Sequence, residues 1–542
     1  MQNIRNFRFP RGFASLTLSL LGGLMMHWAW FPDLFTPLIF VALVPFLAIA
    51  DDEHQSVIEV FGTVFFGFFV FHLTAGWWMY SSTIAGSLMA HLFNAGYMAG
   101  IFALWRILKT ERCLKRWPLM LFIILWLMFE VLHQRWELAW PWFTLGHVFG
   151  ARPSWVQWYR FSGTLGGSFW ILMVNLLIFR LLKSSKNPFS SKSTIRAMLI
   201  ILVLGLPLLL SFWLRKSHDN PTKTLKVMVV QPNIHPQQEK FAGMPALAQL
   251  EKALKIVHRH ALDSLKLIVF PETMLVDAID ENNPQQSALL QPLLELVNEY
   301  PLAVVAGAYS MRYKNWNLSD GQAVMRDSVP YVLYNSALWI HGDEIAFYHK
   351  EKLMPLVEKQ PFERWMKPMR KWIEQSGGFF GRYGTFNTKI YFLLDNAVMI
   401  RPLICFESAF SIDGKRWSSR SIIVLLTNDG WWKTSGGYQQ HLMLARLRAI
   451  ETGKWIARSA NTGVSAFLDP KGEIVAQCPY GKEGALIYDV PVNEDVTFYS
   501  AFGKYFDALP FSIGMSLLLC FACKKFLLFW TKSRKKNHLQ KK

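Results

Sequence analysis

The sequence predicts a membrane domain of several α-helical spans, joined to an α/β domain that lies outside the membrane. Charged residues make up only 18% of the 542 residues and hydrophobic residues 52%, whereas soluble domains carry roughly 25% charged residues. Long apolar runs fill the N-terminal part, and after residue 214 they shorten to strand length and alternate with helical patterns. We therefore expect a membrane domain at 1–214, an external domain at 215–505, and a last span with a basic tail at 506–542.

Seven apolar runs of the N-terminal part are candidate transmembrane helices, because a helix needs about 20 apolar residues to cross a bilayer. They are residues 13–30, 34–50, 57–78, 84–104, 118–132, 165–182 and 197–214. Residues 507–523 form an eighth and shorter run. The first run has no clear cleavage site and more runs follow directly, so we expect a retained helix and not a signal peptide.

The net charge of +19 suggests either a nucleic-acid partner or a membrane topology signal, and the positions of the basic residues favour topology. Lys and Arg gather before the first run and at 106–116, 180–196 and 532–542, all on one side of an eight-span protein. Basic loops remain in the cytoplasm, so we expect both termini inside, the 215–505 domain outside, and no nucleic-acid partner.

The external domain has the pattern of an α/β fold. The predicted strands are residues 225–231, 265–270, 302–308, 336–340, 397–405, 421–427, 463–468 and 486–490. Helical periodicity occurs at 246–261, 287–297 and 437–450. Strands this apolar are buried on both faces, with helices covering them. The five scattered cysteines do not form a disulfide scaffold, and with no metal-ligand spacing or phosphate loop apparent, we expect no metal and no cofactor.

Three reactive side chains lie at or beyond the ends of apolar segments: Glu272, Lys350 and Cys405. Active-site groups of α/β folds gather at the carboxyl ends of strands. A single Cys in a strand is more often a small buried hydrophobe. A Cys nucleophile, however, needs a base and a cation beside it, and a Glu and a Lys supply these. The nearby Lys352 keeps open the alternative that Lys350 is a surface residue.

The order Pro271-Glu272, Lys350 and Cys405 resembles the nitrilase superfamily, whose members carry a Glu-Lys-Cys triad on an αββα sandwich. Within it, spans before the domain and one after it are similar to the apolipoprotein N-acyltransferase family. Further similar segments are residues 140–146, 426–431, 440–451 and 458–465. The resemblance covers essentially the whole chain.

The resemblance implies a role for each residue of the triad. Cys405 is then the nucleophile, Glu272 the base that takes the thiol proton and returns it to the leaving group, and Lys350 the cation that faces the developing oxyanion. Such a cation about 4 Å from the oxyanion contributes on the order of 4 kcal/mol at an effective dielectric of 20.

Glu358 and Glu407 are expected to support the triad. Glu358 would orient Lys350 or the acceptor, and Glu407 would bind the acceptor amine or pair with an arginine. Glu130, near the outer end of a span, is either a functional group or a partner of Arg135.

Phe241, Phe406 and Trp431 are expected to contact the substrate. Phe241 stands where the family often has Trp, Phe406 where it often has Tyr, and Val357 where a Gly usually precedes the residue equivalent to Glu358. These departures concern the packing of a lid and the fit of the substrate, and they leave the triad unchanged.

The resemblance implies that the chain transfers a fatty acyl group from a phospholipid, through a thioester on Cys405, to the N-terminal amine of an S-diacylglyceryl-cysteine in an apolipoprotein. The expected location is the bacterial inner (cytoplasmic) membrane, with the α/β domain on the periplasmic or outer face, and we expect a monomer. One alternative is a membrane-tethered amidase or nitrilase, in which water takes the acyl group; another is a transporter or receptor with an external binding domain. Eight spans favour lipid substrates over a tether, and transport leaves the Glu-Lys-Cys order unexplained.

Overall fold

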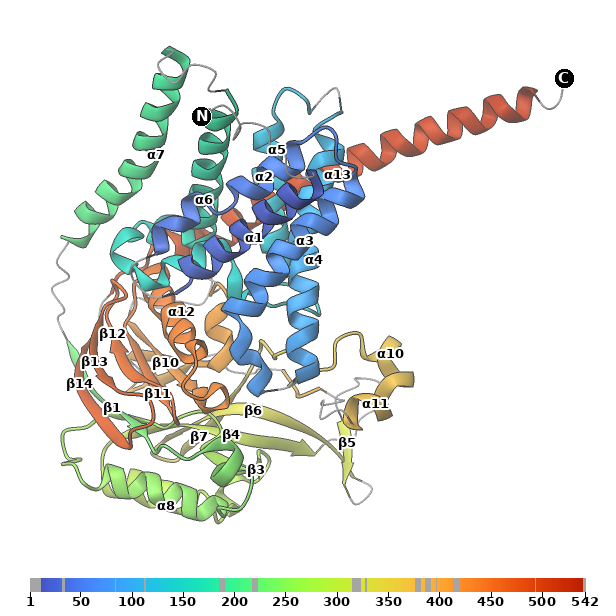
Figure 1. Ribbon diagram of the computed structural model, residues 1–542. Coiled ribbons are helices and arrows are strands. Elements are labelled where there is room, and N and C mark those ends of the chain that lie inside the picture. The colour runs from blue at the N-terminus through green and yellow to red at the C-terminus, as the bar shows by residue number, and fades with distance from the viewer. Residues whose placement is uncertain are drawn as a thin grey trace.

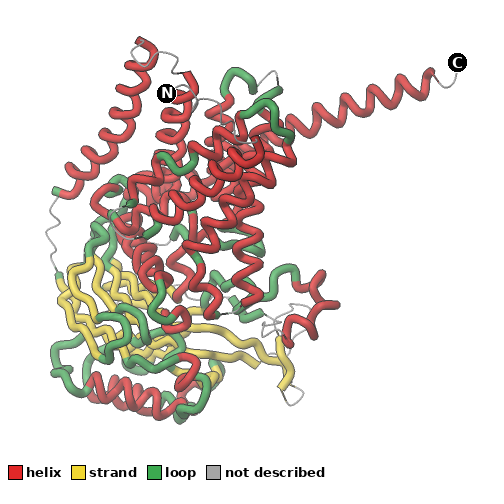
Figure 2. The backbone as a smooth tube through the Cα atoms, viewed as in Figure 1, coloured by secondary structure: helices red, strands yellow, loops and turns green. Residues whose placement is uncertain are grey.

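The computed structural model places a cluster of long helices against a sandwich of two β-sheets (Figures 1 and 2). It describes residues 11–31, 35–82, 84–111, 114–184, 191–216, 223–313, 323–326, 329–375, 382–385, 391–395, 397–412, 420–492 and 494–539. Parts of the predicted basic loops, residues 1–10, 112–113 and 185–190, therefore lie outside the described residues.

Six of the described helices are long and apolar enough to cross a membrane. They are α1 (Arg11–Ala29), α3 (Val57–Ala75), α4 (Ile84–Leu108), α6 (Tyr159–Ser184), α7 (Ser191–Arg215) and α13 (Phe498–Leu539). Each coincides with one of the eight predicted spans, and α13 begins before its predicted span and extends beyond it. Figure 1 shows α13 leading away from the sheets.

The two remaining predicted spans form shorter helices, and prolines mark where those helices begin. Residues 34–50 divide into a 3₁₀ helix, η1 (Thr36–Phe40), and α2 (Val44–Asp51), each with a proline in its first turn. Proline is tolerated there because the first N–H groups of a helix have no partner within it. Residues 118–132 form α5 (Pro118–His133), which also starts at a proline.

Small residues and aromatic rings hold the helical part together. α1 and α3 meet at Gly23 and Gly67, where a Cβ on either residue would overlap the backbone of the other helix. Such close approach of small residues is a common basis of helix packing in membranes. Beside it, Phe46 stacks on Phe68 with ring centroids 4.4 Å apart. We take this cluster of fully buried rings as the core of the helical part.

The α/β part contains two sheets that pack face to face. The first has the order β14-β1-β2-β4-β6-β5, with β3 paired to β4 and β7 paired to β6; the second has the order β13-β12-β11-β10-β9-β8. The strands of the first sheet are β1 (Thr224–Gln231), β2 (Leu267–Val269), β3 (Leu275–Asp280), β4 (Ala303–Tyr313), β5 (Ala323–Arg326), β6 (Val329–His341), β7 (Glu344–His349) and β14 (Gly484–Pro491). Those of the second are β8 (Phe392–Leu394), β9 (Val398–Ile404), β10 (Ser421–Thr427), β11 (Ile456–Ala460), β12 (Ser465–Leu468) and β13 (Ile474–Cys478).

Helices cover the outer faces of both sheets, which confirms the expected αββα layering. α8 (Ala246–Val257) and α9 (Gln291–Glu299) share a hydrophobic core with the outer face of the first sheet. α12 (Gly436–Thr452) covers the second sheet through Ala445 and Ala449. Its other side, with Leu444 and Leu447, belongs to the core of the helical part. α12 is thus shared by both parts of the molecule.

The sequence pattern missed six short or amphipathic strands: β3, β5, β7, β8, β11 and β13. β11 illustrates the reason. It is fully buried, yet Arg458 and Ser459 interrupt its apolar run. Arg458 pairs with Asp429, and the Ser459 hydroxyl donates to the Val230 carbonyl; both partners are distant in sequence. A local pattern contains no information on such partners.

Candidate active site

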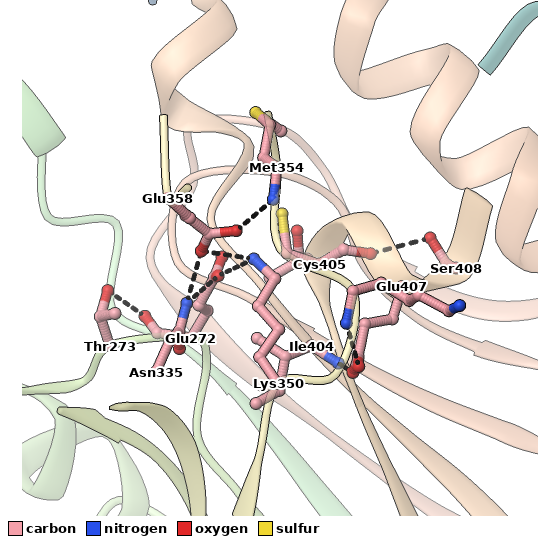
Figure 3. Close-up of polar contacts among 12 residues, drawn as sticks. Glu272, Thr273, Asn335, Lys350, Met354, Glu358, Ile404, Cys405, Glu407 and Ser408 are labelled. Atoms are coloured by element: carbon pink, nitrogen blue, oxygen red, sulfur yellow. Dashed lines mark hydrogen bonds and ion pairs between the residues drawn. The ribbon is translucent and has the colours of Figure 1, made fainter. Parts of the chain in front are cut away.

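Three chain segments, each following a strand of the sandwich, bring Glu272, Lys350 and Cys405 together (Figure 3). Glu272 follows β2, Lys350 follows β7, and Cys405 follows β9. The first two strands belong to one sheet and β9 belongs to the other. The cluster therefore lies where the ends of the two packed sheets meet.

Close contacts of its backbone hold the turn that carries Glu272 in place. Gly307 on β4 passes so close that a Cβ there would overlap Pro271 and Glu272. The Glu272 carbonyl accepts hydrogen bonds from the Thr273 hydroxyl at 2.8 Å and from Lys240 Nζ at 2.9 Å. Lys240 is itself buried, and burial lowers its pKa to about 7, although the Glu272 charge opposes that shift.

Lys350 lies between two carboxylates. Its Nζ donates to Glu358 Oε1 at 2.8 Å and to Glu272 Oε1 at 3.2 Å. Asn335 Nδ2 donates to the same two oxygens, at 3.0 Å each, and the Asn335 carbonyl accepts the Lys350 N–H at 2.8 Å. The other oxygen of Glu358 accepts the N–H of Met354 at 2.8 Å. The structure thus joins Glu358 to Lys350, whereas Lys352 lies over the Phe410 ring.

Burial and the neighbouring charges shift the pKa values of Lys350 and Cys405. Burial alone would lower the pKa of Lys350, but the Glu272 and Glu358 carboxylates outweigh it and raise that pKa well above its usual value. Burial and the Glu272 charge raise the pKa of the Cys405 thiol well above its usual value, and Lys350 offsets only part of this. The resting site therefore holds an ammonium at Lys350 and a neutral thiol at Cys405.

Cys405 begins a tight turn, η10 (Cys405–Ala409), with a left-handed backbone at φ 49°. A residue with a side chain pays about 1–3 kcal/mol for such a conformation, so its surroundings must enforce it. The Cys405 carbonyl meets the Ser408 hydroxyl at 3.0 Å and His441 Nε2 at 3.0 Å. In Figure 3 the Cys405 sulfur points toward the backbone of Met354 and lies beside the Lys350 ammonium and the Glu358 carboxylate.

A buried chain of charged groups supports His441. Its Nδ1 lies 2.8 Å from Asp429 Oδ1, and the other oxygen of Asp429 accepts Arg458 Nη2 at 2.7 Å. Burial alone would raise the pKa of Asp429, but Arg458 and His441 hold it well below its usual range. The Trp142 and Trp432 rings enclose the imidazole at 5.6 and 5.4 Å between centroids. The sequence analysis assigned no role to His441, Asp429 or Arg458. The only sequence signal for them is that they lie in segments that resemble the apolipoprotein N-acyltransferase family.

The carboxylate of Glu407 contacts the Tyr348 hydroxyl and the backbone, while its expected role toward the acceptor amine stays a prediction. One of its carboxylate oxygens accepts the Tyr348 hydroxyl at 2.9 Å and the Glu351 N–H at 2.8 Å. The other accepts the Ile404 N–H at 2.7 Å. Burial raises the pKa of Glu407 to about 7, and these backbone donors oppose the shift. Glu407 thus ties the segment after β7 to η10, the turn that begins at Cys405.

The three predicted substrate contacts do not lie together. Phe241 and Trp431 stack with centroids 5.6 Å apart, and Phe241 is 45% exposed. Phe406 is fully buried and stacks on Trp140 of the helical part at 5.1 Å. It packs the junction between the two parts, which explains how a phenyl ring fits where the family often has a hydroxyl.

An apolar cavity adjoins the loop that follows Lys350. Its walls come from the helical part and from the α/β part and include Trp78, Ala90, Trp140, Met354, Val357 and Trp432. Val357, the residue that replaces the family glycine, thus contributes an apolar side chain to this wall. Met354 also donates its N–H to Glu358, so the cavity begins next to the charged cluster.

Glu130 is buried in the helical part. Its Oε1 accepts the Trp126 Nε1–H at 3.0 Å and the Leu145 N–H at 2.9 Å. These contacts hold the segment after α5 in place. They are neither the pairing with Arg135 nor a contact with the triad.

We expect the buried Lys240 to make stability depend on pH. An unfolded Lys titrates near 10.4, whereas burial places the folded pKa at about 7. Between these values the unfolded chain binds more protons, so the free energy of unfolding rises with pH. In Lys240→Met this rise, measured as melting temperature in detergent at pH 7 and 9, should be smaller than in the wild type. Lys255→Met, at an exposed position of α8, is the control. An unchanged rise in Lys240→Met would contradict the burial effect.

The comparisons with known proteins agree with this arrangement. Residues 226–495 match the carbon-nitrogen hydrolase family model, and residues 22–177 match the model of the apolipoprotein N-acyltransferase N-terminal domain. A protein named apolipoprotein N-acyltransferase from Chlorobaculum tepidum is 28% identical over 535 residues, covering 94% of this chain and 96% of that protein. Proteins of the same name are 25% identical in Haemophilus influenzae, covering 92% and 93%, and 28% identical in Pseudomonas aeruginosa strain PAO1, covering 78% and 80%.

The two family models match both parts of the molecule, and the relatives from Chlorobaculum and Haemophilus align along nearly all of it. This confirms the resemblance seen in the sequence. The chain belongs to the apolipoprotein N-acyltransferase family, with a catalytic domain of the carbon-nitrogen hydrolase type.

Proposed function

We propose that the chain transfers a fatty acyl group from a phospholipid to the N-terminal amine of a lipoprotein cysteine that already carries a diacylglyceryl group. The observation that carries this proposal is the buried cluster of Glu272, Lys350 and Glu358 beside the Cys405 thiol, at the junction with the apolar helices. The names of the full-length relatives support the same reaction.

In the first step, the Cys405 sulfur attacks the ester carbonyl of the phospholipid. Because the thiol is neutral at rest, Glu272 takes its proton as the sulfur–carbon bond forms. Lys350 faces the oxyanion of the tetrahedral intermediate. The carbon–oxygen ester bond then breaks, and Glu272 returns the proton to the leaving lysophospholipid, which leaves a thioester on Cys405.

In the second step, the α-amine of the acceptor attacks the thioester. Its pKa is near 8, so an appreciable fraction is neutral at pH 7. Glu272 accepts one amine proton, the carbon–sulfur bond breaks, and the proton returns to the Cys405 sulfur. The products are an amide and the free enzyme, so the reaction consumes no cofactor.

Lys350 needs an unusual environment to act in both steps. A buried ammonium with a single carboxylate would form a neutral pair with that residue. With Glu272 and Glu358 on either side, Lys350 remains an ammonium throughout the cycle while Glu272 gains and loses its proton. We assign to Glu358 this role of holding the Lys350 charge in position.

The apolar cavity suits a donor with a long acyl chain. It is lined by side chains from the helical part, where a lipid would enter, and it reaches Met354 beside the charged cluster. Trp78, Trp140 and Trp432 supply large apolar surface along it. A chain held there would also exclude water from the thioester, which favours transfer over hydrolysis.

We further propose that the α/β domain lies on the periplasmic or outer face of a bacterial inner membrane, with both termini in the cytoplasm. The basic loops support this orientation. α7 runs from the end of the helical part far from the sheets to the end beside them, and α13 leads away again (Figure 1). The segments before α7 and after α13 would then share one side of the membrane.

Loss of the nucleophile should abolish transfer without loss of the fold. We expect Cys405→Ala to show no acyl transfer to a synthetic diacylated lipopeptide, measured by mass spectrometry, because no other thiol lies in the cluster. Cys478→Ala is the matched control, since Cys478 is likewise a buried free cysteine, in β13. Transfer by Cys405→Ala, or its loss in Cys478→Ala alone, would remove Cys405 from the mechanism. Release of fatty acid instead of lipopeptide acylation by the wild type would favour a hydrolase.

The orientation can be tested by labelling in cells. In a background with Cys113→Ser, Cys520→Ser and Cys523→Ser, which leaves only the buried Cys405 and Cys478, we expect Lys255→Cys on α8 to react with a membrane-impermeant thiol reagent once the outer membrane is permeabilised. Lys192→Cys, at the start of α7, should react only after lysis. Both positions are exposed. If Lys192→Cys is labelled and Lys255→Cys is protected in unlysed cells, the topology is the opposite of the proposed one.

A further inference from the structure

The backbone around Cys405 is held on both sides by hydrogen bonds to side chains. Ahead of it, the Ile404 N–H donates to Glu407 Oε2 at 2.7 Å (Figure 3). Behind it, the Cys405 carbonyl accepts the Ser408 hydroxyl at 3.0 Å and lies 3.0 Å from His441 Nε2. Glu407 and Ser408 belong to η10 itself, whereas His441 comes from α12. His441 therefore ties the turn at Cys405 to a separate element of the fold.

Both ring nitrogens of His441 face oxygens that only accept hydrogen bonds. Nδ1 lies 2.8 Å from Asp429 Oδ1, and Nε2 lies 3.0 Å from the Cys405 carbonyl. A carboxylate and a carbonyl carry no hydrogen, so each ring nitrogen is the donor in its contact. Asp429 is held in turn by Arg458 Nη2 at 2.7 Å and by the Thr427 hydroxyl at 2.8 Å. The imidazole thus connects a fixed carboxylate to the backbone of Cys405.

Large rings enclose the imidazole and leave it little freedom to turn. His441 is fully buried, and the Trp142 and Trp432 rings lie 5.6 and 5.4 Å from it between centroids. The preceding residue, Gln440, accepts the indole N–H groups of Trp78 and Trp142, which fixes the start of α12 against the helical part. The donor that faces the Cys405 carbonyl is therefore held in place independently of η10.

The distances around His441 also match those of a Ser-His-Asp triad, because Ser408 Oγ lies 2.9 Å from Nε2. A nucleophilic serine must be reached by its substrate. Ser408, however, is fully buried and is not among the residues that line the apolar cavity. Its hydroxyl already donates to the Cys405 carbonyl. We therefore assign Ser408 no nucleophilic role and regard the Cys405 carbonyl as the group on which His441 acts.

We infer that His441 is a positioning residue for Cys405. Its Nε2–H donates to the Cys405 carbonyl and so maintains the left-handed backbone, with φ 49°, that places the sulfur beside Lys350. A residue with a side chain keeps such a backbone only where its surroundings enforce it. Without this donor the turn relaxes and the sulfur leaves the charged cluster. The inference rests on the proposed function to the extent that Cys405 is the nucleophile.

Two amide variants separate the two contacts of the ring. In His441→Gln the side-chain amide reaches the position of Nε2 and can donate to the Cys405 carbonyl. In His441→Asn the shorter side chain reaches only the position of Nδ1 and can donate to Asp429. His258→Asn, at the exposed end of α8, is the matched control. All are made in one parent protein that keeps Cys405 as its single thiol through the changes Cys113→Ser, Cys478→Ala, Cys520→Ser and Cys523→Ser.

The first measurement is the rate at which iodoacetamide alkylates Cys405 between about pH 6 and pH 10, which requires no lipid. In the parent, burial and the Glu272 charge hold the pKa of the thiol well above its usual value, so the midpoint lies above about 8.5. In His441→Asn the sulfur leaves these surroundings and the midpoint falls. The rate at pH 8 should rise about tenfold for each unit by which it falls. We expect His441→Gln and His258→Asn to match the parent.

The second measurement is the rate of thioester formation from phospholipid. In His441→Asn this rate should fall about 100-fold at saturating donor, because a displacement of about 1 Å costs that much, with little change in the donor concentration that gives half the maximal rate. His441→Gln should recover most of the loss. If the parent itself forms no thioester, the proposed function fails, while the alkylation rates still test the positioning of Cys405.

Melting temperatures in detergent establish that each variant is folded. The inference is wrong if folded His441→Asn keeps the alkylation midpoint of the parent. It is equally wrong if folded His441→Gln shows a lowered midpoint, since the contact with Asp429 would then matter and the donor to Cys405 would not. If His441→Asn does not fold, the result for His441→Gln alone decides the question.

Discussion

A buried ammonium held between two carboxylates determines how the rest of the site must be built. Lys350, Glu272 and Glu358 are all less than 10% exposed. Charges removed from water this far cost several kcal/mol each unless they are paired and hydrogen-bonded. Asn335 contributes to both carboxylates, and the Met354 N–H to one of them, so the group is satisfied as a unit. Burial, together with the Glu272 charge, raises the pKa of the neighbouring Cys405 thiol, and Lys350 offsets only part of this.

Buried charges need partners from several directions, and this explains why the site lies where two sheets and a set of membrane helices meet. α12 connects these parts through buried polar contacts as well as apolar ones. Gln440 accepts hydrogen bonds from the Trp78 and Trp142 indoles of the helical part. Glu451, at the other end of the helix, accepts the Thr164 N–H and pairs with Arg448. A displacement of the helical part would thus shift the helix that carries His441 and, through the His441 contact with the Cys405 carbonyl, the turn at Cys405.

The architecture could be predicted from the sequence, because the patterns that indicate spans and strands are local. Apolar runs of span length and strands buried on both faces are visible as composition, and Glu272, Lys350 and Cys405 each stand at the end of such a segment. What could not be predicted depends on pairing between distant segments. Asn335 faces the cluster only because β6 pairs with β7 in a register that places Ser336 opposite His349. Glu407 was expected to meet an amine or an arginine, and its backbone partners became visible only in the folded turn. Pro37 and Pro45 indicate that residues 34–50 form two short helices, but a hydropathy count does not take prolines into account.

In the proposed mechanism a long-lived thioester on Cys405 is passed to an amine and not to water. The direct measurement is the intact mass of the purified protein after incubation with phospholipid, followed by removal of the donor. We expect an added acyl mass on Cys405 that persists in buffer and disappears quickly when a diacylated lipopeptide is added, with the acyl group recovered on the lipopeptide. Rapid release of free fatty acid in buffer alone, at a rate that the lipopeptide does not change, would contradict it.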